Sequence, residues 1–288
     1  MIVTLGDHID GLAVDTAAGG RVSSLRLHGQ ERILGRPAAG LEPSIAWGCY
    51  LMAPFAGRVK DGLVTWGGRT VRLPLNGGRH SIHGAGFDNE WAVTESTVSS
   101  VTLTCRIDRE RWPFGGSMTQ RIAISRGRLT LEAEILAEEP MPAALGWHPW
   151  FLNASGPLRV GVQSDNVLRL GPDLIPTGEL VPVDTRTDLR SAPCLNGQAL
   201  DDAYAAVRPP VSVSWPDLEL TMDFKAPITA IVVCTRPEAT AVEPLTAWPD
   251  AIRLAGAGCA ETGLTSLAAG ERLVASTSWS WKTLAAQP

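Results

Sequence analysis

The chain has 288 residues and a formal net charge of −5, with 44% hydrophobic and 19% charged residues. Its 29 glycines and 21 prolines are spread along the whole sequence, which is typical of many short strands joined by turns. The acidic balance argues against nucleic acid or an anionic membrane surface as a partner, because both are bound through clustered Lys and Arg; a small neutral ligand fits better.

The sequence shows neither a targeting signal nor a metal-binding or disulfide pattern of cysteines. Residues 1–8 lack a basic segment followed by a long apolar one, and no later apolar run approaches the ~20 residues that span a bilayer. We therefore expect a cytoplasmic protein that does not associate with membranes. The five cysteines form no CxxC pair and have no histidine at ligand spacing, so we expect reduced, mostly buried thiols and no metal site.

The first 84 residues are predicted to be short strands broken by glycines. Residues 12–15 and 21–27 have strand character and flank a Gly-Gly turn, as in a β-meander. Further on, Arg58 follows the turn-like sequence Pro-Phe-Ala-Gly, from which its guanidinium could reach sugar hydroxyls or form a structural salt bridge. His83 ends a short apolar alternation before a glycine, so we expect it at a strand end where loops gather. His80 has more polar surroundings and is predicted to be a solvated loop histidine.

The middle of the chain contains an aromatic stretch around a histidine. Residues 129–135 alternate between apolar and polar, as in a strand with one wet face. Residues 144–151 then place His148 among Trp147, Trp150 and Phe151. Aromatic faces can cover the apolar C–H side of a pyranose, and an imidazole can exchange a proton near neutral pH. The alternative is a core histidine in an aromatic-rich strand.

Two acidic positions stand out in the last third of the sequence. Asp201 precedes a second aspartate and lies close to a tyrosine, where a solvated turn is the alternative to a binding role. Glu243 follows Ala-Val and precedes a proline, so we expect at least partial burial. A buried carboxyl group has a raised pKa and can act as a base near neutral pH.

The remaining pattern predicts the fold class. Period-2 alternation recurs in residues 211–215, 218–224 and 273–281, whereas no stretch of twelve or more residues has a convincing helical period with caps. Helices should be few and short, and the sheets mostly antiparallel. Since we find neither a linker nor an internal repeat, we expect one all-β domain over residues 1–288.

Seven sequence blocks in order resemble those of the aldose 1-epimerases, or galactose mutarotases. They include a Gly-Arg block at Arg58, a block from Asn76 to the His-Gly at His83, and an aromatic-Pro-Phe element at residues 112–114. They continue with Trp-His-Pro-Trp-Phe around His148, Asp-Asp-Ala-Tyr from Asp201, Val-Glu-Pro-Leu-Thr around Glu243, and a closing Gly-Glu turn at residues 270–271. Each block alone is weak, but their common order along nearly the whole chain is specific.

The resemblance implies a galactose mutarotase-like β supersandwich of large antiparallel sheets, with a sugar bound in a cleft. It also implies that Glu243 is the general base and His148 the general acid, while His83, Arg58 and Asp201 hold the sugar. Asn76 and Trp150, in the same blocks, are further substrate-binding candidates. Trp150 stands where tyrosine is common in the family, a departure that affects substrate choice. Neither a cofactor nor a metal is implied.

The residues themselves are consistent with anomer exchange. The reaction needs the C1 hydroxyl deprotonated and the ring oxygen protonated, and one carboxylate with one histidine can do both. We expect a free, uncharged aldose as substrate.

Alternatives remain at this stage. A hexose-6-phosphate epimerase would require converging Arg or Lys side chains, for which Arg79 is the best candidate. A glycosidase using Glu243 and Asp201 leaves both histidines unexplained. A silent sugar-binding protein has no need of an acid and a base.

Overall fold

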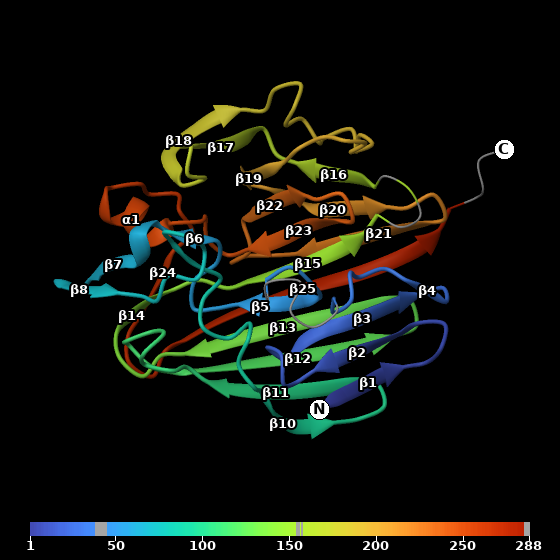
Figure 1. Cartoon of the computed structure of the whole chain (residues 1–288), viewed down its shortest axis with the longest axis horizontal. Coiled ribbons are helices and arrows are strands. Elements are labelled where there is room, and N and C mark those ends of the chain that lie inside the picture. Colours follow the sequence, from blue (N-terminus) through green and yellow to red (C-terminus); the bar gives the residue numbers. More distant parts are fainter. Residues whose placement is uncertain (38–44, 154–155, 157, 285–288) are drawn as a thin grey trace.

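The computed structural model describes residues 1–37, 45–153, 156 and 158–284. Two large antiparallel sheets make up most of it, and their strands run roughly along the long axis of the molecule (Figure 1). The 11-stranded sheet has the order β1 (Ile2–Gly6), β2 (Gly11–Asp15), β3 (Arg21–Leu27), β5 (Cys49–Met52), β15 (Gly146–Leu152), β23 (Ala239–Leu245), β22 (Ala230–Thr235), β19 (Asp201–Ala205), β17 (Asn166–Leu170) and β18 (Pro176–Pro182), with β4 (Gln30–Glu31) paired to β3.

The 8-stranded sheet contains the strands with the clearest alternation in the sequence. Its order is β10 (Ala92–Ser96), β11 (Ser100–Arg106), β12 (Ser117–Ser125), β13 (Arg128–Leu136), β25 (Arg272–Thr283), β21 (Leu218–Phe224), β20 (Arg208–Ser214) and β16 (Arg159–Gln163). In β13 the apolar residues predicted to face inward, such as Leu129 and Leu131, are buried. The predicted strands 21–27 and 218–224 coincide with β3 and β21.

Small elements complete the fold. Three two-stranded sheets pair β6 (Arg58–Val59) with β9 (Ser81–Ile82), β7 (Leu63–Trp66) with β8 (Arg69–Arg72), and β14 (Met141–Ala143) with β24 (Thr265–Leu267). The described residues contain one short helix, α1 (Ala251–Gly256), and one 3-10 turn (Lys60–Gly62). The expectation of few, short helices is confirmed. Figure 1 shows α1, β6, β7 and β8 gathered at one end of the molecule.

The main core lies between the two large sheets, and side-chain alternation decides what reaches it. Phe151 of the larger sheet contacts Trp279 of the smaller one, with 5.6 Å between ring centroids, and both belong to one buried apolar cluster that draws on both sheets. Because successive residues of a strand point to opposite faces, His148 and Trp150 lie on the face of β15 away from this core. The larger sheet therefore has a second face, on which chemistry can be placed.

The burial of the cysteines agrees in part with the expectation of mostly buried thiols. All five cysteines are free thiols; Cys49 and Cys105 are buried, as predicted, whereas Cys194 is exposed. Among the described residues, none of the helices has the length and apolar character needed to cross a membrane.

Candidate active site

The centre of the site is built by neighbouring strands of the larger sheet. Within this sheet β5, β15, β23, β22 and β19 are adjacent. Tyr50 of β5 pairs with His148 of β15, and Glu243 of β23 pairs with Val232 of β22. Period-2 alternation puts all four side chains on the face turned away from the main core. A row of side chains thus crosses the sheet at its middle.

The strand register brings the predicted acid and base together. Gly146 pairs with Leu245 and Trp150 with Ala241, and the same register places His148 opposite Glu243. Directly opposed residues on one face of an antiparallel pair are close enough to interact. Nε2 of His148 lies 3.1 Å from Oε1 of Glu243. Two residues 95 positions apart in the sequence are therefore within ion-pair distance of one another.

Burial controls the protonation of this pair. The relative exposure of His148 is 4% and that of Glu243 is 3%. Burial raises the pKa of Glu243 well above its usual value, with a further contribution from the negative charge of Asp201, while Arg58 acts in the opposite direction. Burial also lowers the pKa of His148 well below its usual value, reinforced by His83. Both shifts favour the neutral carboxyl group and the neutral imidazole.

Aromatic rings fix the orientation of His148. Its ring stacks on Tyr50 at 4.9 Å and lies 4.9 Å from the ring of Trp150, while His83 approaches edge-on at 5.0 Å. The Trp150 indole N–H and the Tyr50 hydroxyl both donate to the carbonyl of Ile45. Packing on several sides leaves the imidazole little freedom to rotate.

His83 enters the site from a strained loop position directly after β9. Its φ is 62°, a left-handed conformation that few non-glycine residues adopt, and its backbone N–H donates to the carbonyl of Gly57 at 3.0 Å. The following residue must be glycine, because a Cβ on Gly84 would lie 2.0 Å from the carbonyl oxygen of Ala53. Burial, aided by the charge of Arg58, lowers the pKa of His83 to about 3, so this imidazole is neutral.

Arg58 and Asp201 form an ion pair at the pocket wall. Nη1 of Arg58 on β6 lies 3.5 Å from Oδ2 of Asp201 on β19, and both side chains are partly exposed. Burial raises the pKa of Asp201, and Arg58 counteracts this effect. The buried Asp250 fastens β6 in place: its backbone N–H donates to the Arg58 carbonyl at 2.8 Å, and its carboxylate accepts from the N–H of Lys60 at 3.0 Å.

Six of the seven predicted site residues line one pocket, which holds about 630 Å³ of space including the part open to solvent. These six are Glu243, His148, His83, Arg58, Asp201 and Trp150. Apolar residues Leu170 and Leu174 contribute to the wall on the β17 side. The mixture of apolar surface with a few polar groups is typical of binding sites.

Asn76 is placed differently from the prediction. Its side chain accepts a hydrogen bond from the backbone N–H of Ile82 at 2.8 Å and donates to the carbonyl of the same residue at 3.2 Å. It does not line the pocket. Asn76 therefore fastens β9, the strand that leads into His83, and its contribution to the site is indirect.

The prediction for His80 is wrong. Rather than being solvated, His80 is 3% exposed, and its Nδ1 accepts a hydrogen bond from the backbone N–H of Asp61 at 3.1 Å. Neighbouring Arg79 is exposed and pairs with the Asp61 carboxylate at 2.9 Å. Neither residue lines the pocket. The segment that contains Arg79 and His80 packs against the 3-10 turn at Lys60–Gly62, an arrangement that local polarity does not reveal.

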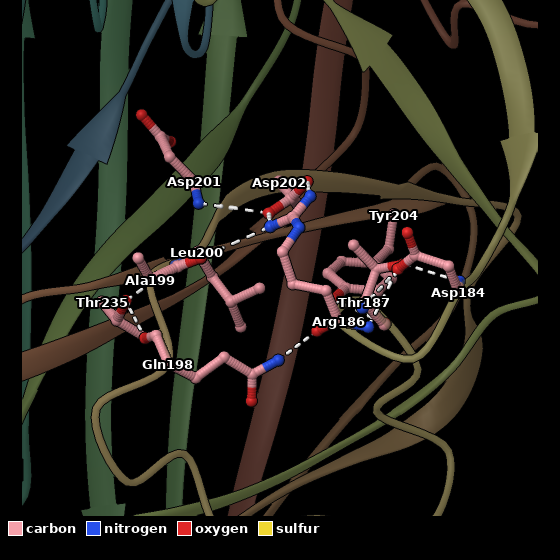
Figure 2. A network of polar contacts seen from close by, with 10 residues as sticks. All are labelled: Asp184, Arg186, Thr187, Gln198, Ala199, Leu200, Asp201, Asp202, Tyr204 and Thr235. Atoms are coloured by element: carbon pink, nitrogen blue, oxygen red, sulfur yellow. Dashed lines mark hydrogen bonds and ion pairs between the residues drawn. The ribbon is translucent and has the colours of Figure 1, made fainter.

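A hydrogen-bond network supports the strand that carries Asp201. Figure 2 shows the guanidinium of Arg186 against the carboxylate of Asp202, with two contacts of 2.6 Å. Tyr204 donates its hydroxyl to the carbonyl of Thr187, and Thr235 receives the N–H of Leu200. The sequence indicated a solvated turn or a binding segment at this position. The structure shows a strand, β19, anchored at both ends.

Sequence reasoning missed Arg236. This residue follows β22 and lines the same pocket, with its guanidinium carbon 4.4 Å from the centroid of the Trp150 ring. The only signal was its place after a predicted buried strand and before a proline. Within the described part of the chain, no group of three or more His, Cys, Asp or Glu side chains is arranged to hold a metal ion.

Comparison with known proteins identifies the family. A family model for aldose 1-epimerase matches residues 1–280. The uncharacterized protein YphB of Escherichia coli K12 is 28% identical over 105 residues, 36% of each chain, and galactose mutarotase of Sus scrofa is 30% identical over 149 residues, 47% of this chain and 43% of that one. The aligned regions thus span less than half the length of these two relatives.

Solved structures show the same fold. The aldose epimerase homologue from C. elegans superimposes with a TM-score of 0.86 and 15% sequence identity, covering 99% of both chains. At this identity the likeness shows the fold alone, which is the galactose mutarotase-like architecture expected from the sequence. Together with the match along residues 1–280, it confirms the resemblance that the seven sequence blocks indicated. The chain belongs to the aldose 1-epimerase family.

Proposed function

We propose that this protein is an aldose 1-epimerase that interconverts the α and β anomers of a free aldose. The observation that carries the proposal is the buried pair of Glu243 and His148, whose reactive atoms lie 3.1 Å apart in the wall of the pocket. Anomer exchange acts on two oxygens bonded to the same carbon. An acid and a base that face one another across adjacent strands suit this requirement.

The proton balance of the pair matches the reaction. In the ring-opening step the Glu243 carboxylate takes the proton of the C1 hydroxyl while the His148 imidazolium gives its proton to the ring oxygen. The C1–ring oxygen bond breaks, and C1 becomes an aldehyde carbon. The pair thus enters the step in its charged form, which burial disfavours, and leaves it in its neutral form, which burial favours. After rotation about C1–C2, the same two transfers in reverse close the ring on the other face.

The surrounding residues supply binding and charge stabilisation. Arg58 and the neutral His83 can donate to sugar hydroxyls and stabilise negative charge on oxygen, and Asp201 can accept hydrogen bonds from hydroxyls. Trp150 offers an aromatic surface to the apolar side of the sugar. Neutral His83 is well suited to this task, because a second positive charge near His148 would oppose its protonation.

An unphosphorylated substrate is supported by the location of the basic residues between 69 and 79. Arg69 pairs with Glu139, Arg72 donates to the carbonyl of Asp61, and Arg79 pairs with the carboxylate of that residue. None of the three lines the pocket. A phosphate dianion is usually held by several converging cations. The structure therefore favours a free aldose over the alternative, a hexose 6-phosphate.

The experiment is NMR exchange spectroscopy on a panel of free hexoses and pentoses, glucose 6-phosphate, and the corresponding methyl glycosides. We expect enzyme-dependent exchange between the anomers of at least one free aldose, above the spontaneous rate, and intact methyl glycosides. Faster exchange of the phosphate would support the hexose-6-phosphate epimerase. Release of methanol from a glycoside would indicate a glycosidase, and tight binding without exchange a sugar-binding protein.

A further inference from the structure

One cation of the pocket has no role in the proposed reaction. Among the described residues, the guanidinium of Arg236 makes no ion pair or side-chain hydrogen bond. It makes a cation-π contact with the Trp150 ring, with 4.4 Å between the guanidinium carbon and the ring centroid. We infer that Arg236 is a specificity-determining residue that binds a carboxylate on the sugar, so that the preferred substrate class is a hexuronic acid. The inference rests on the proposed function and changes the uncharged sugar expected from the sequence to an anionic one.

The backbone of Arg236 is held firmly, as a binding residue requires. Its N–H donates to the carbonyl of Ala239 at 2.9 Å, within the tight turn between β22 and β23. Its carbonyl accepts from the Asn153 side chain at 3.0 Å, and the same amide reaches Pro237 at 3.2 Å. The side chain is half-buried and rests on Trp150, whose indole N–H is itself fixed by Ile45. A preorganised guanidinium loses little entropy on binding an anion.

The other charges of the pocket are already balanced without it. Arg58 pairs with Asp201, and Arg58 also opposes the raised pKa of Glu243. Arg236 is therefore not the cation that supports the base. Its field nevertheless reaches the pocket wall: burial and two nearby carboxylates raise the pKa of Cys234 to about 12, and the charge of Arg236 acts against them. The charge of Arg236 also acts on Asp201, but among the described residues no carboxylate lies within ion-pair distance of it, so the guanidinium can take up a further anion.

The proposed orientation of the sugar brings the right substituent to this cation. The C5 atom, which carries the C6 group, is bonded to the ring oxygen that His148 protonates. Trp150 is the next side chain on the same face of β15, with its ring 4.9 Å from His148, and Arg236 lies on Trp150. We place C5 on the Trp150 side of the ring oxygen, where a carboxylate on C5 would meet the guanidinium of Arg236. A single planar guanidinium matches one carboxylate in a bidentate manner, whereas a phosphate dianion calls for more cations.

The test compares glucuronate with glucose and galacturonate with galactose as substrates for anomer exchange. Measurements use the wild type, Arg236→Gln, and Arg106→Gln as a control with the same change in net charge. The Arg106 side chain is 82% exposed, and its one ion pair within the described part of the chain is with Glu138, at 3.5 Å. We expect the wild type and the control to prefer the uronate by about 10- to 100-fold in kcat/KM, and the preference to fall with added salt. In Arg236→Gln the uronate should lose most of this advantage.

Several results would overturn the inference. One is a wild type without preference for uronates; another is an Arg236→Gln variant that loses uronate and neutral sugar equally, as a hydroxyl-binding arginine would. A preference for glucose 6-phosphate that disappears in this variant would show that the anion is a phosphate.

Titration of methyl glucuronide against methyl glucoside by saturation-transfer NMR separates this inference from the proposed function, because methyl glycosides bind without ring opening. Tighter binding of the glucuronide that depends on Arg236, in a protein that exchanges no anomers, would support the anion site and refute the epimerase.

Discussion

Replacing Arg186 by Gln should destabilise the protein, because the buried Asp202 carboxylate loses its positively charged partner. Asp202 is 6% exposed, and Arg186 holds it through two contacts of 2.6 Å (Figure 2). Loss of a partner in a fully buried pair costs about 3–5 kcal/mol, whereas an exposed pair contributes about 0–1 kcal/mol. Because the Arg186 side chain is 51% exposed, we expect an intermediate loss of about 1–3 kcal/mol in the free energy of unfolding.

Urea denaturation monitored by tryptophan fluorescence measures this loss. Arg169→Gln is a matched control: Arg169 also makes two contacts, of 2.7 and 3.2 Å, with Glu179, but both side chains are more than half exposed. Its loss should stay below about 1 kcal/mol. Adding Asp202→Asn to Arg186→Gln should recover part of the stability, since the stranded charge is removed. Equal losses in Arg186→Gln and Arg169→Gln, or no recovery in the double variant, would refute this reasoning.

Three further predictions concern the pocket and its surroundings. Burial raises the pKa of Glu243 well above 4.5. The stability contributed by its protonated form is therefore complete below the unfolded-state pKa and is lost as the pH rises through the folded-state pKa. Thermal unfolding should show that Glu243→Gln is more stable than wild type at pH 8 and that this gain shrinks toward pH 4. His148→Asn should lower kcat at least about a hundredfold because the acid is lost; steady-state kinetics with only KM raised would make His148 a binding residue instead. Arg79→Ala should leave kcat/KM for both glucose and glucose 6-phosphate unchanged, because Arg79 is held by Asp61 outside the pocket; a selective loss for the phosphate would revive the phosphate hypothesis.

Local patterning was sufficient for most of the fold. Strands such as β13 and β21 were predictable because one face of each packs on the core, which forces period-2 alternation. The lack of helical periodicity likewise predicted few and short helices, and the described residues contain one, α1. The order of strands could not be obtained in this way. Pairing between β15 and β23 depends on contacts between residues far apart in the sequence.

The candidate site was predictable in its composition but not in its geometry. Unusual residue types in apolar surroundings singled out His148 and Glu243, and the resemblance to a family added their roles. The close approach of these two side chains follows from strand register, which one sequence does not specify. The prediction for His80 was wrong and Arg236 was missed for the same reason. The burial of His80 and the position of Arg236 on Trp150 arise from tertiary packing of loops.

The central claim is that Glu243 and His148 open and close the ring of a free aldose. The measurement that tests it most directly is two-dimensional exchange NMR of the α and β anomeric protons of the best substrate, with wild type and Glu243→Gln at equal concentration and the spontaneous rate subtracted. The account predicts rapid exchange with the wild type and a rate at least about a hundredfold lower with the folded variant, whose amide keeps the shape but cannot accept the proton. Equal exchange rates with the two proteins would contradict it.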